Sequence, residues 1–440
     1  MKIVQINTFP YKATGSIMMG IHEMLLENGF DSYVVWGRGR DSENKREIVI
    51  KDNIGTKFHG VFTRLTDRTG FASWRATRKL ISELEMIKPD IIHLHNIHGY
   101  YLNIEMLFTY IKKKNIKVVW TLHDCWSMTG HCAYFDMIGC EKWKAGCKKC
   151  EQKNTYPASK VLDSSEWNWE KKRELFNGLN LSIVTPCEWL KSIVQKSYLS
   201  EYPVRVIYNG IDINKFRPNY RAEVKRKYSP DNKPLVLGVA SEWTERKGLS
   251  DFINLSRNNT DIKFVVVGLT QDQLKGLPEG MTGICRTNNV DELIALYSVA
   301  DVFFNPTYED NYPTTNLEAL ACGTPVVTYD TGGSPESIEQ AFKICGMRIG
   351  TVIKKISPRK VDLRKVIEEI RKMITLNNTP VYSVGGGYSV NSVNVNNNNP
   401  ILDTDNRDSL LRKDCRYVAL LYDKGLRFAD YLNLYNELLS

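Results

Sequence analysis

Residues 300–336 have the sequence ADVFFNPTYEDNYPTTNLEALACGTPVVTYDTGGSPE. The apolar run Val302–Phe304 is followed by an Asn-Pro pair, which predicts a short buried strand. Pro313 occupies the position of a first helical residue, and Gly323 ends the helix that begins there. The β-branched run 324–329 then predicts a second strand. Strand, loop, helix and strand in this order indicate an α/β domain, in which ligands bind where strands end and helices begin.

Three carboxylates lie in or beside the predicted loop and helix. Glu309 and Asp310 belong to the loop, and Glu318 follows roughly one and a half turns into the helix. Free backbone N–H groups at a helix start bind sugar or phosphate oxygens, and a carboxylate accepts hydrogen bonds from two vicinal hydroxyls. In isolation, such acids are more often a solvated helix residue and a turn former. The surrounding sequence favours a polar ligand with many hydroxyls instead.

The second half of this segment, LEALACGTPVV, resembles the donor site of retaining GT-B glycosyltransferases of the family 4 type. That family includes sucrose synthase-like enzymes and bacterial capsule or lipopolysaccharide transferases, and its motif is Glu, seven residues and a second Glu. The resemblance implies that Glu318 holds the ribose hydroxyls of a nucleotide sugar. Asp310 stands eight positions before Glu318 and Glu309 nine positions before it, so either acid faces the sugar as the catalytic carboxylate. In place of the usual Gly-Phe-Gly, the donor side carries Asn311 and Tyr312.

The composition is that of an ordinary soluble globular protein. A chain of 440 residues has room for two or three domains, and its 42% hydrophobic and 25% charged content is ordinary for globular proteins. No run of about 18 apolar residues occurs, and the N-terminus predicts a strand rather than a signal peptide, so we expect a cytoplasmic protein. Ten cysteines without an export signal argue against a disulfide scaffold. The net charge of +9 is compatible with an enzyme at the inner face of an anionic membrane.

The N-terminal region predicts a strand over 2–7, a glycine-bearing turn, a helix to Leu26 and a strand over 30–36. Gly15 lies in the turn, where a glycine either brings backbone close to a ligand or supplies a positive φ. The family resemblance implies that this loop lies in the cleft near the acceptor.

Residues 90–101, DIIHLHNIHGYY, predict a strand that runs into a loop rich in histidine and tyrosine. His93, His95 and His98 either bind a metal or, as we favour, divide between core positions and the lining of a cleft. The stretch resembles bacterial exopolysaccharide transferases of the colanic-acid type, in which it borders the acceptor side. The resemblance therefore places His95 and His98 on that side.

A further strand, 117–122, ends at His123. Thr121, Leu122 and His123 resemble the Thr-x-His motif that GT-B enzymes hold beside the anomeric carbon of the donor. A histidine there hydrogen-bonds a sugar hydroxyl, or its backbone carbonyl supports developing positive charge. His123 is accordingly a catalytic candidate, and the alternative is a structural His123–Asp124 pair at the strand end.

Residues 125–150, CWSMTGHCAYFDMIGCEKWKAGCKKC, form a cysteine-rich insert. Cys147 and Cys150 have the spacing of a zinc knuckle, and Cys132 and Cys140 complete a set of four thiols. Either these residues bind a structural zinc or they are free and core cysteines. Their spacings fit neither common ferredoxin pattern, so an iron–sulfur cluster is disfavoured.

In the C-terminal half, Arg246-Lys247-Gly248 follows the strand predicted over 234–240. The basic pair resembles the diphosphate clamp of the family, in which lysine supplies a point charge and arginine binds phosphate with two N–H groups. Glu242 stands where the family has its arginine, and Arg246 substitutes for it. A solvated turn is the ordinary alternative. After a short strand at 283–286, the resemblance implies that Arg286 or its neighbour Cys285 contacts the nucleotide base.

These observations predict three parts of the chain. Residues 1–205 form an N-terminal acceptor-side domain that carries the cysteine-rich insert, and 206–415 form the donor domain. Within the donor domain, a polar insert at about 377–400 has too little apolar surface to fold alone. Residues 416–440 include a helix over 418–439 that, by the family resemblance, crosses back onto the first domain.

We therefore expect the α/β fold class, GT-B, with two Rossmann-like domains facing each other across a cleft. The expected function is a hexosyl or other glycosyltransferase that moves a sugar from a UDP-, GDP- or dTDP-sugar to a glycan, in particular a lipid-linked glycan of a surface polysaccharide. The resemblance implies retention of configuration. No cofactor is required, because protein charges form the clamp. The alternative is a nucleotide-sugar epimerase or phosphorylase on the same fold, which consumes no glycan acceptor.

Two other classes explain the sequence less well. A zinc or nucleic-acid module built on 125–150 leaves the segment around Glu318 without a role, and so we expect no nucleic-acid partner. A dinucleotide oxidoreductase lacks its fingerprint, since neither half has G-x-G-x-x-G after its first strand.

Overall fold

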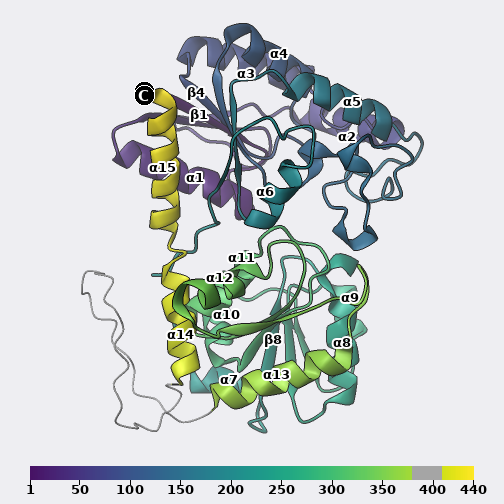
Figure 1. The fold of residues 1–440 in the computed structure, drawn as a ribbon, viewed down its shortest axis with the longest axis vertical. Coiled ribbons are helices and arrows are strands. Elements are labelled where there is room, and N and C mark those ends of the chain that lie inside the picture. Colours follow the sequence, from purple (N-terminus) through teal and green to yellow (C-terminus); the bar gives the residue numbers. More distant parts are fainter. Residues whose placement is uncertain (379–408) are drawn as a thin grey trace.

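The computed structural model describes residues 1–378 and 409–440. It contains two parallel sheets, each covered by helices, which lie one above the other along the long axis of the molecule (Figure 1). The strand orders are β3-β2-β1-β4-β5-β6-β7 and β10-β9-β8-β11-β12-β13. The order at the centre of the first sheet, in which the strand sequence reverses beside β1, is that of a Rossmann-like domain. The predicted two-domain α/β fold is confirmed. Nearly all of the polar insert predicted at about 377–400 lies outside the described residues.

The first sheet is built from near-continuous apolar strands, as expected for strands covered on both faces. Val4 and Ile6 of β1 pair in register with Ile92 and Leu94 of β4, and all four side chains are buried. The strands are β1 (Lys2–Asn7), β2 (Asp31–Trp36), β3 (Glu47–Val49), β4 (Ile91–Leu94), β5 (Lys117–Thr121), β6 (Leu181–Thr185) and β7 (Val204–Val206). The helices are α1 (Lys12–Glu27), α2 (Asn53–Thr66), α3 (Trp74–Ile87), α4 (Ile104–Lys114), α5 (Ser165–Phe176) and α6 (Glu188–Val194).

The second sheet contains the strand, loop, helix and strand predicted over 300–336. Its strands are β8 (Leu235–Val239), β9 (Lys263–Val267), β10 (Met281–Ile284), β11 (Val302–Asn305), β12 (Val326–Tyr329) and β13 (Gly350–Ile353). Its helices are α7 (Ala222–Tyr228), α8 (Leu249–Asn258), α9 (Gln271–Lys275), α10 (Val290–Val299), α11 (Thr314–Ala321), α12 (Glu336–Cys345) and α13 (Leu363–Asn377). Because all strands are parallel, the loop after β11 and the turn after β8 emerge at the same edge of the sheet.

The prediction of a single C-terminal helix over 418–439 is wrong in one respect, because two helices occupy this region. They are α14 (Leu410–Leu420), which packs against α11, and α15 (Lys424–Leu439), which packs against α1 of the first domain (Figure 1). The break has a local cause, because the Asp423 side chain caps the Gly425 N–H at the start of α15. At the same place Ile211 donates to the Tyr422 carbonyl and accepts from the Lys424 N–H, so the two segments that link the domains are hydrogen-bonded together.

The cysteine-rich insert between β5 and α5 has no long element. It contains the short 3-10 turns Trp126–Met128, Asp136–Ile138 and Lys142–Lys144. None of the helices described in residues 1–378 and 409–440 is long and apolar enough to cross a membrane.

Candidate active site

The basic pair and the acidic loop lie together. Arg246 and Lys247 form the turn after β8, and Gly248 follows with φ 74°. A Cβ atom on Gly248 would lie 2.1 Å from the Pro306 carbonyl oxygen, so only glycine permits this approach of the turn to the loop. The approach is fixed by a hydrogen bond of 2.7 Å from the Tyr308 N–H to the Arg246 carbonyl.

Each basic side chain then has a partner in the loop after β11. Lys247 Nζ forms an ion pair with the Asp310 carboxylate, and both side chains are largely buried. Arg246 donates to the Glu309 carbonyl oxygen at 2.7 Å and lies over the ring of Tyr134, 4.5 Å from its centroid. The residues predicted as the diphosphate clamp and the residues predicted as the sugar-facing acids are thus in direct contact.

The Glu309 carboxylate is directed toward the first domain. Its Oε1 atom accepts the Met137 N–H at 2.8 Å, and its side chain is buried. Burial raises the pKa of Glu309. The neighbouring Asn311 also bridges the domains, because its side-chain amide donates to the His123 carbonyl oxygen at 2.7 Å. Asn311 and His123, which the sequence predicted as site residues in different domains, are therefore joined directly by a hydrogen bond.

Glu318 forms its hydrogen bond with a residue outside the cluster of Arg246, Lys247 and the acidic loop. It lies in the second turn of α11, and its Oε2 atom accepts from the hydroxyl of Tyr297 in α10 at 2.9 Å. Burial raises the pKa of Glu318 to about 7. A carboxyl with this pKa is part neutral and part ionised near neutral pH, so it is poised to donate or accept in a hydrogen bond with a hydroxylated ligand.

Two predicted donor residues do not join the basic cluster. The Tyr312 ring is buried against Tyr208 and Tyr422, with centroid distances of 5.4 and 6.4 Å, where the chain passes between the domains. Arg286 is exposed just after β10. Its predicted contact with a nucleotide base stays a prediction.

The histidines of the first domain come together at the carboxyl ends of β4 and β5. His123 Nε2 lies 3.1 Å from His95 Nδ1, and the rings are stacked with their centroids 5.4 Å apart. His95 Nε2 in turn lies 3.2 Å from Gln5 Oε1. Burial lowers the pKa of His123 to about 4 and that of His95 well below its usual value, so both rings are neutral at pH 7.

His98 lies in the same place with different partners. Its Nε2 atom lies 2.8 Å from the Asp124 carboxylate and its Nδ1 atom 3.1 Å from the Tyr156 hydroxyl. A cavity of about 10 Å³ is lined by residues of this group, among them His95, His98, His123 and Asp124. His93, by contrast, is a core residue, bonded to Thr121 and Tyr435. His93 therefore belongs to the core, whereas His95 and His98 line a cavity, which is the division that the sequence analysis favoured.

Gly15 lies in the first turn of α1. A Cβ atom there would lie 2.6 Å from the Phe9 carbonyl oxygen, so the glycine is explained by close packing of the helix on the loop before it. Gly15 is not among the residues with positive φ, so the alternative that this glycine supplies a positive φ is wrong. Its place on the acceptor side stays a prediction.

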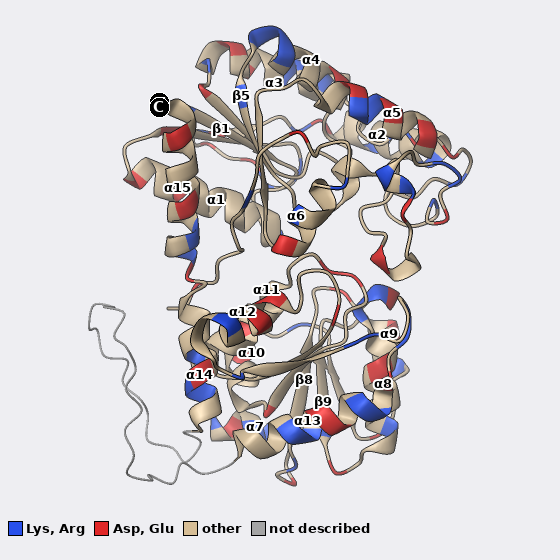
Figure 2. Cartoon of the chain, viewed as in Figure 1, with Lys and Arg blue, Asp and Glu red and all other residues tan. Residues whose placement is uncertain are grey.

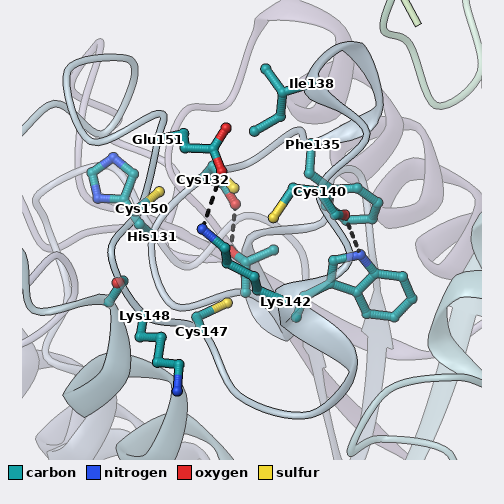
Figure 3. Close-up of a pocket in the computed structure, with 13 residues that line it drawn as sticks. His131, Cys132, Phe135, Ile138, Cys140, Lys142, Cys147, Lys148, Cys150 and Glu151 are labelled. Carbon is teal, nitrogen blue, oxygen red and sulfur yellow. Dashed lines mark hydrogen bonds and ion pairs between the residues drawn. The ribbon is translucent and has the colours of Figure 1, made fainter. Parts of the chain in front are cut away.

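Four of the five cysteines of the insert line one cavity of about 20 Å³ (Figure 3). Figure 3 shows the sulfur atoms of Cys132, Cys140, Cys147 and Cys150 around this space. Every cysteine is a free thiol. Among the residues that the structure describes, however, no group of three or more His, Cys, Asp or Glu side chains is arranged to hold a metal ion. His131 is committed to other partners, the Asp67 carboxylate and the Thr155 carbonyl oxygen.

Several residues of the site had no signal in the sequence. Tyr134 and Met137 belong to the cysteine-rich insert, yet they contact Arg246 and Glu309 of the second domain. Glu336, the last residue of the segment 300–336, accepts the backbone N–H groups of Glu188 and Trp189 at 2.8 and 2.7 Å. Contacts between segments so far apart in the chain leave no local pattern.

Two Rossmann-like domains that meet beside the basic pair, the acidic loop and His123 have the architecture of the GT-B glycosyltransferase fold. A family model described as Glycosyltransferase Family 4 matches residues 17–215, and one described as Glycosyl transferases group 1 matches residues 221–372. The chain belongs to the GT-B glycosyltransferases of the family 4 type.

Individual relatives agree with this assignment. Over 368 residues the chain is 25% identical to the putative colanic acid biosynthesis glycosyl transferase WcaC of Escherichia coli (strain K12), an alignment that covers 78% of this chain and 86% of that protein. Sucrose-phosphate synthase of Thermosynechococcus elongatus has a similar fold, with a TM-score of 0.65 at 15% identity over 100% of this chain and 99% of that one. Anabaena HepE, solved in complex with UDP-glucose, has a TM-score of 0.59 at 13% identity over 99% and 100% of the two chains.

Proposed function

We propose that this glycosyltransferase moves a sugar from a nucleotide diphosphate sugar to a lipid-linked glycan during synthesis of a surface polysaccharide. The observation that carries the donor assignment is the contact of Arg246 and Lys247 with the loop that holds Glu309 and Asp310. A lysine charge and a guanidinium beside the loop that leads into α11 suit a diphosphate, which gathers negative charge as the sugar leaves. The name of the Escherichia coli relative supports a role in polysaccharide synthesis.

Asp310 is the carboxylate that we assign to the sugar. It has the family spacing to Glu318, and its ion pair with Lys247 places it beside the diphosphate clamp. Glu309 instead holds the Met137 N–H and so ties the donor loop to the first domain. With the diphosphate bound, Lys247 gains a second anionic partner, and Asp310 becomes available to the hydroxyls of the transferred sugar.

Glu318 is assigned to the ribose. In its ionised form it accepts two vicinal hydroxyls as a fork, while the Tyr297 hydroxyl holds one of its oxygens. During transfer the bond between the sugar carbon and the diphosphate oxygen breaks, a bond to the acceptor oxygen forms, and the proton of the acceptor hydroxyl passes to the departing diphosphate. The nucleoside diphosphate leaves with the negative charge that Lys247 and Arg246 stabilise, and we propose that configuration is retained.

The acceptor is assigned to the first domain. The small cavity there is lined by the neutral rings of His95 and His123, by His98 and by the Asp124 carboxylate, and groups of this kind hydrogen-bond a sugar hydroxyl. The His123 carbonyl, held by Asn311, lies where the two domains meet and supports positive charge on the sugar carbon.

We propose that transfer needs no metal cofactor, because protein charges neutralise the diphosphate. Transfer should therefore persist without added Mg²⁺ or Mn²⁺, in protein whose metal content has been checked. Loss of activity that Mg²⁺ or Mn²⁺ restores would contradict this.

The test is a thermal-shift screen against UDP-, GDP- and dTDP-sugars, followed by release of the nucleotide from the best donor with and without a glycan acceptor. We expect release to depend on the acceptor and the product to be a longer glycan. Equal turnover without the acceptor would instead indicate an epimerase or, with phosphate as the acceptor, a phosphorylase. If no nucleotide sugar stabilises the protein, the donor assignment is wrong.

A further inference from the structure

Helix α2 directs its apolar side chains toward solvent. Its buried residues are His59, Gly60 and Thr63, which are polar or small. Four of its five apolar residues are exposed, from 50% for Leu65 to 77% for Ile54, and the fifth, Phe62, is partly buried against the core. The exposed set is Ile54, Phe58, Val61 and Leu65, which recur at helical spacing and form one stripe. A surface helix of a soluble domain ordinarily buries such a stripe, so α2 has the opposite orientation.

Neighbouring segments extend this stripe into a larger surface. The ring of Trp74 at the start of α3 lies 6.0 Å from that of Phe58 and is exposed. On the other side, the Leu162 N–H donates to the Leu65 carbonyl at 3.2 Å, which places a second exposed apolar pair at the end of α2. We call the combined surface the apolar face; it consists of Ile54, Phe58, Val61, Leu65, Trp74, Val161 and Leu162.

Basic residues outnumber acidic ones around the apolar face, whose acidic neighbours are Asp52 before α2 and Asp163 after Leu162. Between Asn53 and Ser82 the sequence has one acidic residue, Asp67, which is buried and bonded to His131. Exposed basic residues of the same region are Lys57, Arg64, Arg75, Arg78 and Lys160. None of these five forms an ion pair with a carboxylate in the part of the chain that the structure describes. The outer helices α5 and α13 differ, since acidic and basic residues alternate along them (Figure 2).

We propose that the apolar face binds the surface of an anionic lipid bilayer. Exposed Trp and Phe side chains among unpaired Lys and Arg are the composition of helices that lie in a membrane interface, where the rings enter the acyl boundary and the cations contact lipid phosphates. A second copy of the chain fits less well, because a two-fold contact would bring like charges against each other.

The apolar face is continuous with the acceptor side of the candidate site. The Lys160 N–H donates to the Arg64 carbonyl at 2.8 Å, which fixes the segment 156–162 against the end of α2. At the other end of that segment, Tyr156 is half exposed and its hydroxyl lies 3.1 Å from His98 Nδ1. A lipid-linked acceptor in the bound bilayer therefore presents its glycan next to His98, a consequence that rests on the proposed function.

The experiment is flotation of the full chain with vesicles of phosphatidylcholine alone or mixed with anionic phosphatidylglycerol. We expect binding to the anionic vesicles and release by salt. Phe58→Ser combined with Val61→Ser should lower the bound fraction about tenfold, and Arg75→Gln with Arg78→Gln should remove the preference for anionic lipid. The matched control is Phe342→Ser in α12, which changes a phenylalanine of the other domain that is 65% exposed, against 51% for Phe58, and should leave binding unchanged.

Two results would overturn the proposal. One is a wild-type chain that floats with neither vesicle, including the case in which it forms a dimer that Phe58→Ser dissociates. The other is a Phe58→Ser, Val61→Ser chain that floats like the wild type. Donor turnover with a water-soluble acceptor needs no membrane and should be unchanged in that variant. Absence of turnover in the wild type would contradict the proposed function and leave the vesicle result standing.

Discussion

Lys247 and Asp310 form an ion pair between the turn after β8 and the loop after β11, with side chains that are 19% and 16% exposed. The pair fixes the lysine at the edge of the sheet before any donor binds. A diphosphate must therefore compete with Asp310 for the ammonium group, and this competition links binding of the nucleotide to the position of the sugar-facing acid. Solvent screens this pair little, because both groups are largely withdrawn from water.

Replacing Lys247 by alanine should lower kcat/KM for the donor about 100-fold, the loss typical of removing one preorganised charge from a developing anion. Steady-state kinetics with the best donor checks this. Lys275→Ala provides the control, since Lys275 is an exposed lysine of the same domain that pairs with Asp272 in solvent. Wild-type kinetics for Lys247→Ala would remove the basic pair from the donor site.

The two neighbouring acids should differ in their response to amide substitution. Glu309→Gln keeps an oxygen that accepts the Met137 N–H, so we expect activity within about threefold of the wild type. Asp310→Asn removes the charge that pairs with Lys247 and the carboxylate assigned to the sugar, so transfer should fall at least about 100-fold. The reverse ranking in the same kinetic assay would show that Glu309 is the sugar-facing acid.

Donor binding should depend on pH through Glu318. The pKa of about 7 means that this carboxyl is largely protonated below pH 7, in which state it accepts fewer hydrogen bonds from ribose hydroxyls. We expect the donor dissociation constant, measured by calorimetry, to decrease as pH rises through about 7.

Two variants test this assignment. Tyr297→Phe removes a hydrogen bond that lowers the pKa of Glu318. The pH at which the donor dissociation constant decreases should therefore be higher in this variant. Glu318→Gln should bind the donor weakly at every pH. If Glu318→Gln keeps the pH dependence of the wild type, another group is responsible.

Much of the second domain could be predicted from the sequence because its signals are local. Pro306 and Gly323 bound a strand and a helix within one short stretch, and the acids and the basic pair stand at strand ends, which parallel pairing brings to one edge of the sheet. The same parallel pairing explains why His95 and His123, which were predicted as site residues separately, lie together at the ends of β4 and β5.

The features that could not be predicted from the sequence depend on residues far apart in the chain. Tyr312 follows the acids directly, yet its ring packs against Tyr208 and Tyr422 of the segments that link the domains. The break between α14 and α15 is set by hydrogen bonds with Ile211. Helix α2 has an amphipathic pattern that sequence alone would assign to burial, whereas the structure exposes its apolar side. In each case the deciding contact is made by residues far away in the chain.

The buried histidines should make the protein less stable in acid. Burial lowers the pKa of His93 to about 3 and that of His59 to about 3. The unfolded chain takes up these protons at about pH 6.5 and the folded chain does not. Stability is therefore fully present above about pH 6.5 and is lost as pH falls toward about 3, with a decrease of about 1.5 kcal/mol per fully buried histidine between pH 6.5 and 5.

Urea unfolding at a series of pH values measures the slope of the free energy of unfolding against pH. His93→Gln should be less stable at pH 7, because Thr121 and Tyr435 lose their imidazole partner, but its stability should fall less between pH 7 and 5. Glu27→Gln, an exposed substitution at the end of α1, should keep the slope of the wild type. An unchanged slope in His93→Gln would mean that other groups cause the acid sensitivity.

The cysteine-rich insert should bind about one zinc ion per chain, because four of its thiols line a single cavity and zinc favours four thiolates. Since no metal-holding group is assembled among the described residues, the thiols must draw together when the ion binds. Burial raises the pKa of Cys147 to about 11, so binding must also release its proton, and zinc affinity should increase with pH.

Elemental analysis of protein purified without chelator tests this, with Cys147→Ser as the variant and Cys345→Ser, a half-buried cysteine of the other domain, as the control. Cys147→Ser should lose the metal and Cys345→Ser should keep it; a wild-type chain without zinc would show that the thiols are free. The insert also carries Tyr134 and Met137, which contact Arg246 and Glu309. Loss of the ion should therefore loosen these contacts and weaken donor binding, even though the metal takes no part in the transfer itself.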